Sequence, residues 1–183
     1  MSLLPAPEHT FCHLTLDFIG PLPLCKDHGY NYRYILQVVD CLTKRVWIIP
    51  METMTARETA SAFLANIFRF CGLPDSLVSD QGRAFIDATW KDICSELKIS
   101  HKLSTSYHPQ TDGQTERANK TLEVYLRHYV NYLQDDWVKH LPIAEFSINN
   151  HTNASTGLSP FFVSFGHHPR LDFHPESDTP ATS

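Results

Sequence analysis

The stretch Leu14-Thr15-Leu16-Asp17-Phe18-Ile19-Gly20 decides how the chain folds and raises the first question about its function. Its apolar and β-branched residues are typical of a buried strand, but Asp17 interrupts them. A buried carboxylate is strongly unfavourable unless a metal or a cation compensates its charge. Asp17 is therefore either a functional side chain or the outward-facing residue of an edge strand, and the stretch alone leaves both interpretations open.

The first third of the chain predicts strands, because β-branched and aromatic residues lie between turn signals. Three strands are expected to form an antiparallel meander, over residues 11–19, 32–40 and 45–50. The capping box Thr55-Ala56-Arg57-Glu58 then opens a helix. Its inward face is expected to consist of Phe63, Ile67 and Phe70.

The middle of the chain predicts two more strands with a helix between them. The strands are expected over residues 76–79 and 99–103, and Trp90 and Cys94 mark the amphipathic helix. Strands followed by helices interleaved with further strands predict an α/β fold with a mixed sheet.

The polar segment over residues 104–113 is rich in turn formers, and we expect an exposed, mobile loop. A second capping box at residues 111–114 then opens a helix, and a last helix is expected over residues 136–149, with a kink at Pro142. The core face of the earlier helix should hold Leu122, Tyr125, Leu126, Tyr129 and Leu133, so that Glu116, Asn119, Lys120 and Glu123 face away from the core.

The length and composition suit one domain. The chain has 183 residues, 42% of them hydrophobic, which is enough for one full core. We expect an N-terminal extension over residues 1–10, a folded domain over 11–170 and an acidic, disordered tail over 171–183. No apolar run nears the ~20 residues that cross a bilayer, and the start does not resemble a signal peptide. The expected location is intracellular, without membrane contact.

The charge and the cysteines constrain the partners. A formal net charge of −5 argues against a nucleic-acid partner, but residues 97–133 carry five Lys or Arg against three Asp or Glu. The five cysteines are widely spaced, which favours reduced thiols over a disulfide framework. His9 and His13 have the spacing of half a zinc site, but no close cysteine pair completes it.

Two further carboxylates join Asp17. Asp80 follows the strand over 76–79, where open α/β sheets place ligands, although Asp is also an ordinary turn residue. Glu116 alone could merely pair with Lys120 one helical turn later. Together the three carboxylates suit a hard-cation site, because Mg²⁺ prefers oxygen ligands and serves phosphodiester transfer.

The spacing and surroundings of these carboxylates resemble the catalytic core of retroviral-type integrases, in particular those of gypsy-type LTR retrotransposons. Asp80 and Glu116 are separated by 35 residues, as in the Asp, Asp-35-Glu signature of that family. The likeness covers roughly residues 8–170. The blocks that carry it are Leu16 to Pro23, Ser79-Asp80-Gln81-Gly82, Tyr107 to Asn119, Asn149-Asn150-His151-Thr152 and Gly157-Leu158-Ser159-Pro160-Phe161.

The resemblance implies an RNase H-like fold, a mixed five-stranded sheet flanked by helices. It implies that Asp17, Asp80 and Glu116 are catalytic and bind two Mg²⁺ ions, for which Mn²⁺ can substitute. The implied activity is that of a DNA polynucleotidyl transferase with endonuclease activity, which trims the 3′ ends of element DNA and transfers them into target DNA. A nuclear location follows from the same resemblance.

The resemblance also implies contacts with double-stranded DNA. By position, Tyr107, Pro109 and Gln110 match the loop that grips the DNA end, and Asn119 and Lys120 match the helix face beneath it. Their chemistry agrees, since Lys120 can reach phosphate and Tyr107 can stack on an unpaired base. For both, an ordinary surface contact is the alternative. Glu123 stands where related enzymes have a second lysine, which weakens the expected grip.

Two alternatives stay open. The chain could be a domesticated or isolated integrase-derived domain that acts mainly in protein assembly, since the zinc-binding and basic flanks of the family are absent from this sequence. In either case a homodimer or higher assembly is expected, with Trp137 and Phe146 as candidate contact residues.

The second alternative is a ribonuclease H. It would use the same fold and metals, but it usually has four carboxylates and lacks the Tyr-x-Pro-Gln loop.

Overall fold

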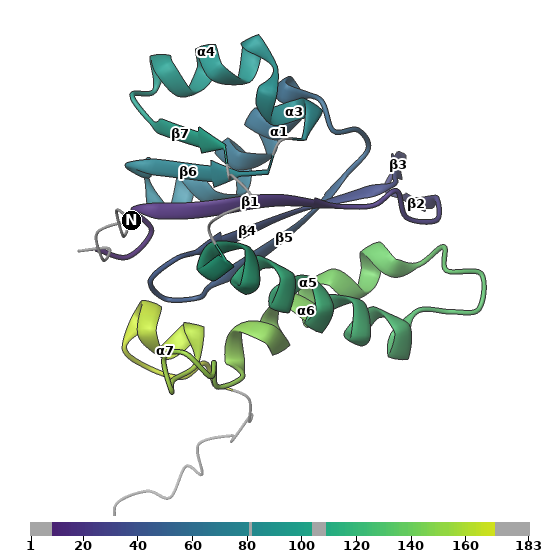
Figure 1. Cartoon of the computed structure of the whole chain (residues 1–183). Coiled ribbons are helices and arrows are strands. Elements are labelled where there is room, and N and C mark those ends of the chain that lie inside the picture. Colours follow the sequence, from purple (N-terminus) through teal and green to yellow (C-terminus); the bar gives the residue numbers. More distant parts are fainter. Residues whose placement is uncertain (1–8, 81, 104–108, 171–183) are drawn as a thin grey trace, which may run out of the picture.

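A five-stranded sheet with helices on both faces forms the centre of the molecule (Figure 1). The structure is a computed structural model, and it describes residues 9–80, 82–103 and 109–170. The strand order is β5-β4-β1-β6-β7, with β1, β4 and β5 antiparallel and β6 and β7 parallel to β1. The predicted meander and mixed sheet are thus confirmed. The strands are β1 (His13–Ile19), β4 (Tyr34–Asp40), β5 (Val46–Met51), β6 (Ser76–Ser79) and β7 (Ser100–Leu103).

The helices cover the two faces separately. One face carries the N-terminal and middle helices, and the other carries the two long helices of the C-terminal half (Figure 1). The first group is α1 (Ala56–Phe63), the π-helical turn η1 (Leu64–Phe68), α2 (Arg69–Cys71), α3 (Arg83–Ile86) and α4 (Ala88–Glu96). The second group is α5 (Pro109–Tyr129) and α6 (Trp137–Asn150), with the short α7 (Pro160–Phe165) beside α6. A small hairpin of β2 (Cys25–Asp27) and β3 (Tyr30–Tyr32) turns at His28 and Gly29.

The alternation along β1 divides its side chains between two cores. Leu14 and Leu16 are buried in the first core, under α1 and α4. Ile19 packs against the second core, where Leu122 of α5 meets strands β4 and β5. Successive residues of a strand point to opposite faces, so Asp17 lies on the face that α5 covers. The predicted strand is confirmed, and Asp17 is half-buried within it.

The start of α1 follows the predicted capping box, but its far end does not follow the predicted pattern. Thr55 Oγ1 accepts a hydrogen bond from Glu58 N at 3.3 Å. Phe63 and Ile67 are buried as expected, whereas Phe70 is 70% exposed. The π-helical turn η1 explains the error, because its wider turn rotates the residues that follow away from the inward face.

The outer edge of the sheet is closed by side chains of α6. Asn149 accepts from Val46 N at 2.8 Å and donates to Val46 O at 2.7 Å. Glu145 accepts from Ile48 N at 2.9 Å. Pro50, the next residue in this alternation, has no N–H to offer. These contacts leave β5 few free donors along its outer edge, so it is a poor template for another strand.

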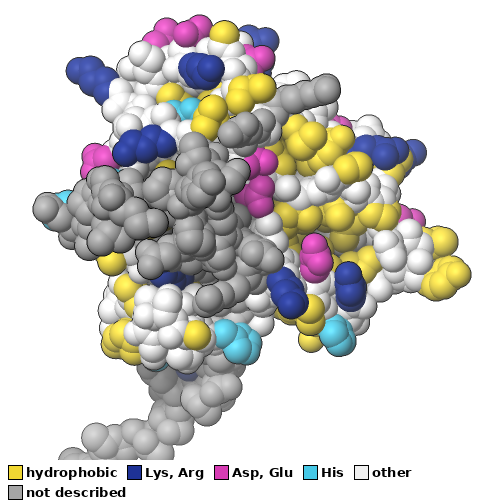
Figure 2. All heavy atoms as spheres, in the orientation of Figure 1, with side chains coloured by type: hydrophobic (Ala, Val, Ile, Leu, Met, Phe, Trp, Pro, Cys, Tyr) yellow, Lys and Arg dark blue, Asp and Glu magenta, His cyan; other side chains and the backbone are white. Residues whose placement is uncertain are grey.

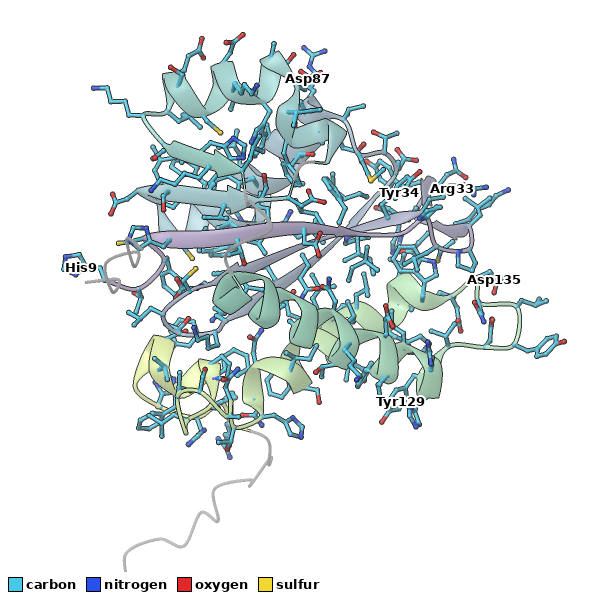
Figure 3. The ribbon with its side chains drawn as sticks, viewed as in Figure 1. His9, Arg33, Tyr34, Asp87, Tyr129 and Asp135 are labelled. Atoms are coloured by element: carbon cyan, nitrogen blue, oxygen red, sulfur yellow. The ribbon has the colours of Figure 1, made fainter. Side chains whose placement is uncertain are left out.

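The helix α5 differs from its predicted bounds at both ends. It begins at Pro109, so residues 109–113 are helical rather than part of a loop. Proline suits the first position of a helix, which needs no N–H there and whose φ it presets. Tyr129 and Leu133, expected in the core, are 57% and 71% exposed. The helix ends at Tyr129, which Figure 3 labels at its far end, so the core pattern does not extend to Leu133.

The predicted N-terminal extension and C-terminal tail are not tested, because residues 1–8 and the segment 171–183 lie outside the described residues.

The remaining expectations concern the last helix, the cysteines and the membrane. The helix predicted over 136–149 is confirmed as α6, with Pro142 inside it. All five cysteines are free. No helix in the described part of the chain is long and apolar enough to cross a membrane.

Candidate active site

Asp17 of β1 and Asp80, which follows the last residue of β6, lie next to each other where the parallel pairing of the two strands ends. The register pairs Leu14 with Leu77 and Leu16 with Ser79, so the two aspartates each follow the last registered pair. Neighbouring strands lie about 4.8 Å apart, which sets the scale of the separation between these two backbone positions. This edge is where open α/β sheets hold ligands.

Both carboxylate oxygens of Asp17 accept hydrogen bonds. Its Oδ1 accepts from the backbone N–H of Phe18 at 2.9 Å, and its Oδ2 accepts from Asn119 Nδ2 at 2.6 Å. The sequence pattern predicted that Asn119 would face away from the core, and in this respect it was wrong. Asn119 faces the end of β1 because α5 crosses the sheet there, and the surface that it meets is a polar site rather than an apolar one.

Asp80 is exposed, and its carboxylate contacts the backbone two residues later. Its Oδ1 accepts from Gly82 N at 2.9 Å. A Cβ added to Gly82 would lie 2.8 Å from the same oxygen, so the Asp80 carboxylate would have to shift. The glycine therefore allows the backbone to approach the carboxylate, a role that the sequence analysis did not assign although Gly82 belongs to one of its blocks.

The residue before Asp80 connects the turn to the core. Ser79 is buried, and its Oγ lies 2.9 Å from Nε2 of His101 on β7. Burial lowers the pKa of His101, and the charge of Lys91 lowers it further. A neutral imidazole thus supports the strand end that carries Asp80.

For four other predicted site residues, Glu116, Tyr107, Pro109 and Gln110, the structure describes the backbone at most. Glu116 lies on α5 three residues before Asn119, and positions three apart share one side of a helix. Its helical position is therefore on the side of α5 that faces Asp17, while its side chain lies outside the described part. The side chains of Pro109 and Gln110 also lie outside it, as does the whole of Tyr107.

Comparison with known protein families identifies the family of this chain. The family model described as "Integrase core domain" matches residues 8–109, more than half of the chain. The chain belongs to the integrase core domain family. The resemblance to integrases of gypsy-type LTR retrotransposons is confirmed.

The relatives of this integrase core include transposon proteins of fission yeast. The Tf2-3 and Tf2-4 transposon polyproteins of Schizosaccharomyces pombe are both 34% identical to it over 169 residues, which is 92% of this chain. The chain spans 12% of the length of these curated relatives.

Solved structures confirm the RNase H-like fold of this integrase core. The catalytic core of HTLV-2 integrase in complex with magnesium, in a trimeric form, is 20% identical and has a TM-score of 0.61, covering 84% of this chain and 96% of that one. The catalytic core of BIV integrase is 22% identical with a TM-score of 0.64, covering 85% and 95%. A simian T-cell lymphotropic virus intasome in complex with the PP2A regulatory subunit B56 gamma is 22% identical with a TM-score of 0.67, covering 94% and 60%.

The exposed side of α5 in this integrase core carries alternating charges. Lys120 is exposed, as the helical register predicted. Glu123 pairs with Arg127 one turn later, at 3.9 Å between Oε2 and Nη2. Figure 2 shows basic side chains on either side of an acidic one in the lower part of the molecule, where α5 runs. An exposed pair of this kind adds little stability, but it offsets the positive charge of Arg127.

The donor set of this integrase core fits a hard cation. Among the described side chains, no group of three or more His, Cys, Asp or Glu gathers as a metal site. Asp17 and Asp80 nevertheless occupy adjacent backbone positions, and Mg²⁺ takes one or two carboxylates together with waters and substrate phosphates. The third predicted ligand, Glu116, comes from a helix that already contacts Asp17 through Asn119.

The candidate residues for self-association need one correction. Trp137 is 2% exposed, and its Nε1 donates to the carbonyl oxygen of Pro23 at 2.8 Å. It is therefore a core residue and is not free to form a contact between copies. Phe146 is half-buried against Phe161, with ring centroids 5.3 Å apart.

Proposed function

We propose that this chain is a DNA polynucleotidyl transferase that trims the 3′ ends of element DNA and joins them to target DNA. Asp17, Asp80 and Glu116 are the proposed catalytic residues and the ligands of Mg²⁺, which Mn²⁺ can replace. The observation that carries the proposal is the adjacency of Asp17 and Asp80 where the parallel pairing of β1 and β6 ends, in a chain of the integrase core family.

The protein's own groups orient the carboxylates before any DNA arrives. Asn119 and the Phe18 N–H each fix one oxygen of Asp17, and Gly82 N fixes one oxygen of Asp80. When bound, the metal ions activate the attacking oxygen and stabilise the leaving oxygen of the phosphodiester. Water would be the nucleophile for trimming and the 3′-hydroxyl for joining, so one site serves both reactions.

The DNA contacts in this proposal lie around α5. In this proposal Lys120 binds a backbone phosphate, and Tyr107, Pro109, Gln110 and Asn119 contact the element's DNA end. The low positive charge of this surface makes binding weak. Assembly of two or more copies on double-stranded DNA in the nucleus would compensate by multiplying the contacts.

The test compares two matched substitutions in the purified chain. Asp80→Asn removes a charge from the proposed site. Asp87→Asn makes the same change at the exposed N-cap of α4, where Asp87 accepts from Thr89 N at 2.8 Å and where Asn caps equally well. We expect Asp80→Asn to reduce Mg²⁺-dependent cleavage and joining of a branched DNA to background, and Asp87→Asn to leave both unchanged. Full activity of Asp80→Asn would disprove the catalytic role.

The assembly function is the second candidate, and the net charge of −5 and the Glu123–Arg127 pair favour it. In that case the unmodified chain would join no DNA at millimolar Mg²⁺, yet would self-associate in sedimentation experiments. A chain that both self-associates and joins DNA in an Asp80-dependent manner excludes assembly as the sole function.

A further inference from the structure

Gln37 is a polar residue in a position that packing does not explain. It lies in β4 directly opposite Asp17 in the antiparallel register. Its side chain is fully buried, at 0% exposure. Neither its Nε2 nor its Oε1 has a hydrogen-bond partner among the described residues. A buried polar group without a partner destabilises the fold, so stability alone would favour an apolar residue here.

The neighbours of Gln37 make its polarity more unusual. Ile35 and Val39, two residues away on either side, share its face of the strand and are buried in the second core. Ile48, its partner on β5, belongs to the same core. Three aliphatic residues thus surround one amide, and the only polar group of its register partners is the carboxylate of Asp17.

A second buried polar atom, Oδ1 of Asn119, could accept a hydrogen bond from the Gln37 amide. Asn119 donates Nδ2 to Asp17 Oδ2, which turns its Oδ1 away from the carboxylate. That Oδ1 is buried and has no partner among the described residues. Directly paired residues of antiparallel strands project to the same face, so Gln37 and Asp17 both lie on the face that Asn119 approaches from α5. Gln37 supplies a buried donor where Asn119 has a buried acceptor.

We propose that Gln37 is a positioning residue for Asp17. A rotation of its amide brings Nε2 to Asn119 Oδ1 and forms a chain in which Gln37 donates to Asn119 and Asn119 donates to Asp17. These two hydrogen bonds fix which way the Asn119 amide points, and therefore keep its donor on Asp17 Oδ2. The role of these hydrogen bonds in cation binding rests on the proposed function, whereas their existence does not.

A double-mutant cycle, without metal or DNA, tests the hydrogen-bonded connection from Gln37 through Asn119 to Asp17. Gln37→Met keeps the size and removes the amide, and Asn119→Ala removes the acceptor. Urea unfolding of the two single variants and the double variant should show a coupling that corresponds to at least about a fivefold change in the unfolding equilibrium constant. Additive effects, or a Gln37→Met variant more stable than the unmodified protein, would overturn the proposal, because an amide that never finds a partner only destabilises.

The consequence for the cation is tested by titration with Mn²⁺ alone. Residues that orient metal ligands change affinity by about 10–100-fold when replaced, so Gln37→Met should weaken Mn²⁺ binding about tenfold. Gln37→Leu should weaken it as well, because its side chain cannot donate to Asn119. The matched control is Ile35→Met, which introduces the same side chain two residues away on the same face and should leave the affinity unchanged.

The two proposals fail in different ways. If the unmodified chain binds no Mn²⁺, the metal-dependent function fails, and the urea cycle still decides whether the chain of amides exists. If it binds Mn²⁺ and both Gln37 variants bind equally well, the positioning role is refuted while the proposed function stands. An equal loss of affinity in Ile35→Met would also refute it, since any change of packing would then suffice.

Discussion

The backbone N–H of Gly82 donates to Asp80 Oδ1 at 2.9 Å, and a Cβ on residue 82 would lie 2.8 Å from that same oxygen. The two residues are therefore coupled, because a side chain at residue 82 would displace the Asp80 carboxylate from its present orientation.

Gly82→Ala should consequently impair catalysis without unfolding the protein. The φ of Gly82 is −57°, which alanine adopts readily, so the strain falls on the Asp80 carboxylate rather than on the backbone. We expect joining activity to drop at least about tenfold, consistent with the effect of small displacements in phosphoryl-transfer sites. The unfolding midpoint should change little.

Gly29→Ala is the control for that prediction. Gly29 has a φ of +86° at the tip of the β2–β3 hairpin, and nothing lies near its missing side chain. Alanine there is strained, so stability should fall while activity per folded molecule is kept. Full activity of Gly82→Ala would contradict the proposed coupling between the turn and Asp80.

The charges on α5 predict opposite effects of two substitutions on DNA binding. Lys120→Ala should weaken binding and reduce the slope of log affinity against log salt by about one, because one phosphate contact is lost. Glu123→Lys should strengthen binding, since it adds a charge and frees Arg127 from its pair. Fluorescence anisotropy at several salt concentrations measures both.

Lys139→Ala serves as the reference for net charge, because Lys139 is exposed on α6. An equal loss of affinity in this variant would show that only total charge matters and that α5 is not the binding surface. Stability should hardly change in any of these variants, since exposed i,i+4 pairs contribute about 0.3–0.5 kcal/mol.

His101 predicts a loss of stability in acid. Burial holds its pKa below the ordinary value, so the folded protein favours the neutral imidazole. Its contribution to stability is complete above an unfolded-state pKa of about 6.5 and decreases as the pH falls through the lower folded-state value. Melting temperatures between pH 5 and 7.5 should therefore fall less steeply in His101→Gln than in the unmodified protein.

Lys91 offers an independent check of this electrostatic argument. Its charge is the second cause that lowers the pKa of His101. Lys91→Ala should raise that pKa toward its ordinary value and so reduce the acid sensitivity, while leaving the Ser79 contact in place. A steeper acid loss in Lys91→Ala would contradict the assignment.

Asn149 predicts a large effect on stability at the sheet edge. Its amide satisfies both the N–H and the C=O of Val46, and it is fully buried. Asn149→Leu leaves two backbone groups unpaired and should cost about 2–4 kcal/mol of unfolding free energy. The adjacent Asn150→Leu makes the same change at a half-buried position and should cost much less. Equal effects in urea unfolding would refute the capping role of Asn149.

The local patterns of the sequence predicted most elements because the physics behind them is local. Alternating apolar residues indicate strands such as β1 and β4, and Thr55 with Glu58 indicates the start of α1. The errors occurred where one local pattern was extended too far. Phe70 follows a π-helical turn, and Leu133 follows the end of α5, so neither continues the periodicity that suggested it was buried.

The sequence by itself determined the acidic residues, their spacing and the family to which the chain belongs. Only the tertiary structure decided that Asp80 lies next to Asp17, because that adjacency arises from pairing of β1 with β6, two strands far apart in the chain. The same holds for Asn119 and Gln37, whose relation to Asp17 depends on how α5 crosses the sheet and on the register of β4. Local periodicity distinguishes buried from exposed, but it cannot tell which buried polar groups meet.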